Sequence, residues 1–312
     1  MKGEKYMEPK ANNRENFFDL LWVNYTELIG EGYQEKPLEW VKLFRAENSN
    51  GAFEKYKEVN GLPVWEENYE GQPYNEAQRG EGFPITIYNH RYDQSYYITW
   101  EYMEDNKEKI MGGKGVDLTG AREMGRGCRV KQELTAVEII NNGFSNVGYD
   151  GVPLFSASHP LMNGTCSNVA GVGETALTDA NLKKAIENAK KQVDNTGIKI
   201  QTKPDQIFVA SNLYFTALTI LHSVQVAGNS LNDKNVIPEV TPLQVIEMSY
   251  FDDNIWVLKD SSMRNLIFQW RSKPEFGYYN IQGTADYKVW GRARWGVGYI
   301  DWRGLYGAKY VA

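Results

Sequence analysis

One long stretch without proline limits the possible folds of this 312-residue chain more than any other feature. Residues 116–144 contain no proline, and apolar side chains recur there at spacings of three, three and four residues: Leu134, Val137, Ile140 and Phe144. This spacing places the four side chains on one face of a helix. Three glycines, at positions 120, 125 and 127, each cost about 1 kcal/mol relative to alanine. We therefore predict one long helix with a break or bend in its first half.

Two different patterns precede this helix. Residues 13–29 have apolar side chains at helical spacing, and residues 38–45 form a second, short candidate helix before a polar connection. We interpret this region as an extended arm that carries small helices. Residues 64–100 change to aromatic and β-branched side chains interrupted by glycine and proline, a composition typical of hairpins. They predict a long projecting β-loop whose tip lies near residues 71–82.

The second half of the chain predicts an α/β module. Thr178 and Asp179 are typical of a helix start, and the helical pattern that follows ends at Gly197. A buried strand at residues 206–210, a helix at 212–223 and strands at 243–250, 254–259 and 266–270 come next. Residues 286–310 predict one long returning strand with glycine bends. The expected fold class is α+β.

The composition excludes several classes of protein. The formal net charge of −6 argues against a nucleic-acid-binding protein with a broad basic face. Every apolar run ends well before the ~18 residues that a membrane span needs, and the first residues lack the hydrophobic region of a signal peptide. Cys128 and Cys166 lie outside any metal or disulfide motif, which favours a reduced environment. We expect a protein that is made and assembled in the cytosol without a membrane partner.

The sequence contains no motif for catalysis, cofactor binding or metal binding. His90, His159 and His222 are too scattered for a metal site, and the glycine-rich pieces match neither the phosphate-loop nor the dinucleotide pattern. His159 lies close to Ser156 and Ser158, but no G-x-S-x-G elbow or triad accompanies them. We interpret this segment as a structured turn, and the chain as a protein without enzymatic activity.

One cluster of positive charge stands out in this acidic chain. Its members fall near the start of the predicted long helix: Arg122, Arg126, Arg129 and Lys131. One hypothesis is a basic stripe that neutralises phosphates of nucleic acid without reading their sequence. The alternatives are a solvated helix face and a set of salt bridges between subunits.

Several motifs carry a resemblance to a known family. They are NNGFSNVGYDGVPLFSASHP at residues 141–160, GTCSN at 164–168, ALTDANLKKAI at 176–186 and GRARWGVGYIDWRGLYG at 291–307. Together with the order of arm, β-loop, long helix, α/β module and returning strand, they resemble the major capsid protein of tailed bacteriophages of the Hong Kong 97 type. The first three motifs are similar to the major head subunits of Mu-like phages.

The resemblance implies a division of the chain into five segments. These are an N-terminal arm at residues 1–59, an extended β-loop at 60–101, a peripheral domain with its spine helix at 102–175, an axial domain at 176–276 and the return strand of the peripheral domain at 277–312. It also implies the function of a major capsid protein, which self-assembles as hexamers and pentamers into the icosahedral shell around phage double-stranded DNA. The expected location is the virion, after assembly in the host cytoplasm.

The same resemblance names the expected partners. They are other copies of the chain, together with portal, scaffolding and decoration proteins and non-specific contact with packaged DNA. Arg122, Arg126, Arg129 and Lys131 are the residues expected to face that DNA. Two alternatives stay open: the shell protein of an encapsulin-like compartment, and a carbohydrate-active or carbohydrate-binding protein that uses the aromatic β segments.

Two sets of residues are expected to contact adjacent subunits. The first is the apolar face of the arm helix, formed by Phe17, Leu21 and Leu28, which packs on a neighbour or on the underside of its own spine helix. The second is the β-loop, with Gln72, Tyr74 and Arg79, because a hairpin of this length with so few core residues is not stable alone.

Overall fold

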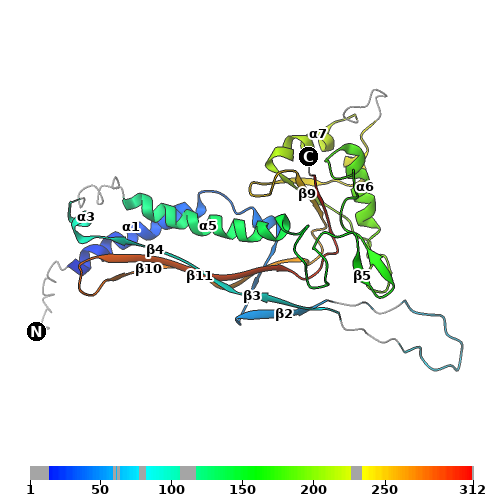
Figure 1. Ribbon diagram of the computed structural model, residues 1–312, viewed down its shortest axis with the longest axis horizontal. Coiled ribbons are helices and arrows are strands. Elements are labelled where there is room, and N and C mark those ends of the chain that lie inside the picture. Colours follow the sequence, from blue (N-terminus) through cyan, green and yellow to red (C-terminus); the bar gives the residue numbers. More distant parts are fainter. Residues whose placement is uncertain are drawn as a thin grey trace, which may run out of the picture. The chain divides into compact units, whose positions relative to one another are not determined.

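A computed structural model describes residues 14–58, 61, 64–76, 82–105, 117–225 and 234–310. The chain divides into two units, each built from three separate stretches of sequence (Figure 1). Unit 1 comprises Met1–Leu38, Arg91–Gln132 and Ser272–Ala293, and unit 2 comprises Glu39–His90, Glu133–Arg271 and Arg294–Ala312. The expected five-segment division of the chain stays a prediction.

Unit 1 packs two helices on one face of a sheet (Figure 1). The helices are α1 (Arg14–Gln34) and the first part of α5 (Asp117–Asn141). The sheet consists of β4 (His90–Ile98) and parts of β10 (Leu266–Asn280) and β11 (Tyr287–Tyr299), and the short helix α3 (Trp100–Asp105) follows β4. Buried side chains from both layers form one core: Tyr25, Ile29, Ile98, Met103, Ala121, Met124, Tyr287 and Val289.

The predicted long helix is a single helix, α5, and the expected break at its glycines is absent. Close packing against α1 explains Gly125 instead. A Cβ atom on Gly125 would lie 2.0 Å from the carbonyl oxygen of Ile29, and one on Gly32 of α1 would lie 2.0 Å from that of Arg122. Two helix backbones can approach this closely only where glycine removes the side chain from both.

The core of unit 2 is a four-stranded sheet in the order β12-β9-β7-β8. Its strands are β7 (Gln206–Ala210), β8 (Gln244–Met248), β9 (Ile255–Lys259) and β12 (Leu305–Lys309). β7 runs parallel to β8, whereas β9 is antiparallel to both β7 and β12. The helices α6 (Asp179–Lys190) and α7 (Tyr214–His222), with a 3-10 turn at Ser211–Leu213 and the short α8 (Ile237–Val240), contribute apolar side chains to the same core.

The remaining elements of unit 2 are short. The helix α2 (Trp40–Leu43) precedes β1 (Arg45–Asn48), which pairs in parallel with the start of β10 in a sheet of order β1-β10-β11-β4. Trp40 stacks on Phe268 of β10 with ring centroids 3.9 Å apart. β2 (Phe53–Lys57) pairs with β3 (Pro84–Tyr88), and β5 (His159–Leu161) pairs with β6 (Gly164–Cys166).

Three sequence predictions of secondary structure need correction. The predicted returning strand is two strands in different sheets, β11 and β12, because the Asp301 carboxylate accepts the Arg303 N–H in a turn that ends at Gly304, with φ +76°. The helix predicted to end at Gly197 ends at Lys190, because Asp194 accepts backbone N–H groups in a separate turn. The polar connection expected after α2 instead contains β1 and β2.

Candidate interaction surfaces

Two members of the basic cluster on α5 are paired with glutamates of unit 1. Arg122 forms an ion pair with Glu31 of α1 at 2.8 Å. Arg126 lies 3.4 Å from Glu123 and 3.9 Å from Glu35. All of these side chains are about half exposed, so the pairs contribute little to folding stability. The nearby carboxylates nevertheless reduce the positive potential of this helix face.

The other two members of the cluster are in different surroundings. The side chain of Arg129 is buried, and its Nε has no hydrogen-bond partner among the described residues. Lys131 places its ammonium group 5.6 Å from the ring centroid of Tyr92 on β4, a cation–π contact. The four cations therefore do not form one open stripe. Contact of this cluster with packaged DNA stays a prediction.

The expected contact residues of the arm helix are only partly described. Phe17 and Leu21 lie within α1, but their side chains fall outside the described residues. Leu28 is half-buried and packs against the core of unit 1 beside Tyr25 and Ile29. Packing on its own spine helix was one of the two expected alternatives for this face. An intersubunit role of these residues stays a prediction.

The extended loop between β2 and β3 exposes aromatic rings. Trp65 is 98% exposed and Tyr74 is 96% exposed, and no ring contact of either is found within the described part of the chain. A local turn orders this segment, since Gln72 N–H donates to the Tyr69 carbonyl at 3.1 Å and Gly71 has φ +83°. Gln72 is also exposed, whereas the third expected contact, Arg79, lies outside the described residues.

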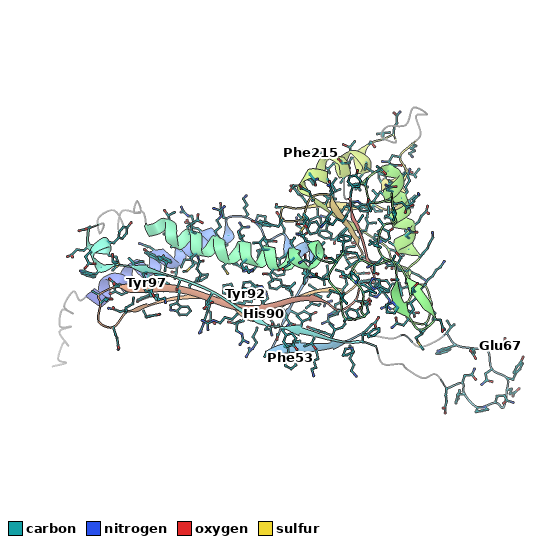
Figure 2. The ribbon with its side chains drawn as sticks, viewed as in Figure 1. Phe53, Glu67, His90, Tyr92, Tyr97 and Phe215 are labelled. Carbon is teal, nitrogen blue, oxygen red and sulfur yellow. The ribbon has the colours of Figure 1, made fainter. Side chains whose placement is uncertain are left out.

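The same loop is strongly acidic. Residues 64–76 contain four glutamates and neither lysine nor arginine: Glu66, Glu67, Glu70 and Glu76. All four are exposed, and none forms an ion pair within the described part of the chain. Figure 2 shows Glu67 on the loop beyond the paired strands. We call residues 64–76 the acidic loop.

Unit 1 presents a surface of opposite charge on the sheet face that α1 and α5 leave uncovered. Side chains of alternating residues on three strands point there: Arg91, Asp93 and Tyr97 from β4, Lys273, Glu275 and Tyr279 from β10, and Lys288, Trp290 and Arg292 from β11. We call these nine residues the outer sheet face. Four cations and two carboxylates give it a net charge of +2 within an acidic chain. A groove of about 440 Å³ runs over it.

Aromatic rings contact two of the four cations of the outer sheet face, Lys288 and Arg292. Arg292 lies over the Trp290 ring at 5.2 Å and pairs with Glu275 at 2.9 Å. Lys288 lies 4.9 Å from the Tyr97 ring centroid and donates to the Tyr97 hydroxyl, a bond that raises the pKa of this lysine. Sequence reasoning missed this face, although the period-two alternation of side chains in β4 and β11 could have revealed it.

His159 has a structural environment. Its Nδ1 lies 2.6 Å from Asp150 and its Nε2 lies 3.0 Å from Asn168, while its ring stacks on Trp302 at 4.1 Å. Both ring nitrogens are therefore engaged, and neither is left to activate Ser156 or Ser158. The side chain is fully buried, as expected for a structured turn. No cluster of metal-ligating side chains is found within the described residues.

Three buried charged side chains of unit 2 have no signal in the sequence. Glu58 and Arg303 form an ion pair at 2.7 Å although 245 positions separate them. Lys259 is buried and donates a hydrogen bond to the Leu43 carbonyl oxygen. Burial lowers the pKa of Lys259 to about 8, although Asp205 opposes the shift.

No helix within the described residues is long and apolar enough to span a membrane.

Comparison with known structures gives the fold. The decorated capsid of bacteriophage JBD30 is 14% identical with a TM-score of 0.54, over 70% of this chain and 92% of the other. The capsid of the cyanophage P-SCSP1u is 10% identical with a TM-score of 0.56, over 88% of this chain and 89% of the other. The virus-like particle of Pyrococcus furiosus is 12% identical with a TM-score of 0.52, over 91% of this chain and 96% of the other.

Comparison with protein families gives the relationship. No curated protein matches the chain by sequence. The family model described as "Phage capsid protein" matches residues 87–308, well over half of the chain. The expected closeness to Mu-like phages stays a prediction. The chain belongs to the phage capsid protein family and has the α+β fold of Hong Kong 97-type capsid proteins.

Proposed function

We propose that this protein is the repeating subunit of a phage head, which assembles as hexamers and pentamers into a closed icosahedral shell around double-stranded DNA. Membership of the phage capsid family supports the shell. The virion capsid is then its location, and assembly takes place in the host cytoplasm. Portal and scaffolding proteins complete the head, and the exposed members of the basic cluster on α5, Arg122, Arg126 and Lys131, touch the packaged DNA.

A decoration protein is a further proposed partner. The capsid of bacteriophage JBD30, which shares the fold, is decorated with trimers of a minor capsid protein. An encapsulin-like compartment is the second candidate function, because a virus-like particle of Pyrococcus furiosus also has this fold. The content of purified particles distinguishes the two, since DNA supports the phage head and a protein cargo supports the compartment.

The observation that carries self-assembly is the opposite character of two surfaces on the same chain. The acidic loop has four exposed glutamates, without an ion pair among the described residues, and exposed rings at Trp65, Tyr69 and Tyr74. The outer sheet face has a net charge of +2 and its own rings. Aromatic anchors surrounded by complementary charge are typical of protein interfaces. The acidic loop of one subunit therefore docks on the outer sheet face of an adjacent subunit.

A charge-swap experiment tests this docking. The variant E67K/E70K reverses the loop and K288E/R292E reverses the face, so each alone places like charges together and loses particles. A chain with all four substitutions restores opposite charges and recovers particles, as counted by negative-stain microscopy. The control E187K/E247K makes the same change of net charge as E67K/E70K, at exposed glutamates elsewhere in unit 2. This control keeps assembly. Normal particles from both single-surface variants contradict the docking.

A further inference from the structure

Arg303 ties three distant segments of unit 2 together from a buried position. Only 3% of the residue is exposed, and it lies in the turn between β11 and β12. Its guanidinium donates to Glu58 at 2.7 Å, to Asp301 at 3.2 Å and to the Val193 carbonyl at 3.2 Å, and also to Asn195. The planar fork of arginine suits such a site, because its donors point in fixed directions.

Glu58 stands at the root of the extended loop. It directly follows β2, and its backbone N–H donates to the Phe83 carbonyl, at the other end of the loop, at 3.1 Å. A Cβ atom on Gly82 would lie 2.4 Å from the Glu58 carbonyl oxygen, so the two ends of the loop are pressed together. The carboxylate of Glu58 turns inward, where its side chain is 3% exposed.

Stability alone is a weak reason for this arrangement. A buried ion pair loses hydration of both charges, and apolar side chains of similar volume often stabilise a fold as well or better. A fork-shaped partner fixes direction, which an apolar contact does not. Tyr149 adds a second constraint, since its ring lies 6.3 Å from Phe83 and 5.4 Å from Tyr299. The root of the loop is therefore held by a directional ion pair at Glu58 and by ring packing at Phe83.

We propose that Arg303 is a positioning residue, which through its ion pair with Glu58 fixes the direction in which the acidic loop leaves unit 2. The proposal rests on the proposed function, because the loop needs a fixed direction only if it docks on a second copy. Both side chains are buried in unit 2, so they act through the loop and not on a neighbour directly. They set where the acidic loop is presented, before any neighbour is bound.

The test measures loop direction in the unassembled chain. Spin labels are placed at Q72C on the loop and D253C on the body of unit 2, in a C128S/C166S background, and their distance distribution is recorded. The parent gives one narrow peak. E58Q and R303K keep the size of each side chain and retain the far-ultraviolet spectrum, yet broaden the distribution at least about twofold. The control E47Q removes one partner of the exposed Glu47–Arg264 pair and leaves the peak unchanged.

Particle yield is the second readout. E58Q lowers the particle yield at a subunit concentration at which the parent and E47Q assemble fully. A higher concentration of subunits restores the yield, because a loop with a wrong direction still docks when collisions with neighbours are more frequent. A parent distribution as broad as that of E58Q overturns the positioning role, and so does an unchanged peak in both variants. Absence of particles from the parent itself overturns the proposed function instead, and leaves the distance measurement as an independent test. If R303K does not fold, E58Q carries the test alone.

Discussion

From the burial of Lys259 we predict that the free energy of unfolding rises at alkaline pH. Its pKa is about 8 in the folded protein, against 10.5 for a free lysine. At a pH between these two pKa values, Lys259 keeps its proton in the unfolded chain and has lost it in the folded chain. The unfolded state then binds more protons, so the free energy of unfolding rises with pH. From pH 7 to pH 9.5 this linkage amounts to about 2 kcal/mol.

Urea unfolding of the unassembled chain at several pH values measures this rise. K259M removes the titrating group and with it the rise, so the difference between the parent and K259M isolates Lys259 from other groups. The control K309M changes a partly exposed lysine on the adjacent strand β12 and keeps the rise. Parallel curves for the parent and K259M across this range would show that Lys259 is not desolvated in the folded state.

Three further predictions concern packing and charge. G125A inserts a methyl group at the crossing of α1 and α5 and lowers the free energy of unfolding by about 1–3 kcal/mol. G30A adds a methyl group that meets no neighbouring atom within 4 Å and raises the free energy of unfolding by about 0.5–1 kcal/mol. Urea unfolding compares the two variants. H159A leaves a buried carboxylate and amide without their partner and costs about 3 kcal/mol, measured as a loss of thermal stability. R122E/R126E leaves the formation of empty shells intact, as seen by microscopy. It lowers the stability of DNA-filled particles at low salt, measured as DNA release. Loss of assembly itself would instead show that these arginines contact an adjacent subunit.

Patterns within one element were predictable from the sequence. The helix α5 and the strand β7 follow from uninterrupted periodicity and composition, and Thr178 caps α6 as its position before the helix indicated. The motifs within residues 141–168 indicate the family from the sequence alone. Local signals are strong there because the spacing of apolar side chains along one element indicates its type and its buried face.

Features that depend on distant residues were not predictable. Gly125 weakens a helix when the helix is considered alone, and only the approach of Ile29 from α1 explains why glycine is retained. The division of the predicted return strand depends on the turn at Asp301 and on a partner for β12 that lies about 50 residues earlier in the chain. The ion pair of Glu58 with Arg303 has no local signature at all, because each residue resembles a surface charge in its own segment.

The candidate surfaces show the same limit. The charge cluster on α5 was visible in the sequence, but its pairing with Glu31 of α1 and with Glu35 directly after α1 was not. Gln72 and Tyr74 of the extended loop are exposed, and their contact with an adjacent subunit stays a prediction. The negative charge of this loop indicates an interface only when it is compared with the positive charge of the outer sheet face. That face combines three strands from separate parts of the sequence.

The most direct test of the role of the extended loop is negative-stain microscopy of the purified protein, with and without its scaffolding protein, for the parent and for a chain lacking residues 72–80. We expect closed particles from the parent, and a folded chain without particles from the deletion, because the extended loop is shortened and loses Tyr74 and Glu76 while the cores of both units remain. Particles of normal size and closure from the deletion variant would contradict the central claim that the extended loop joins adjacent subunits.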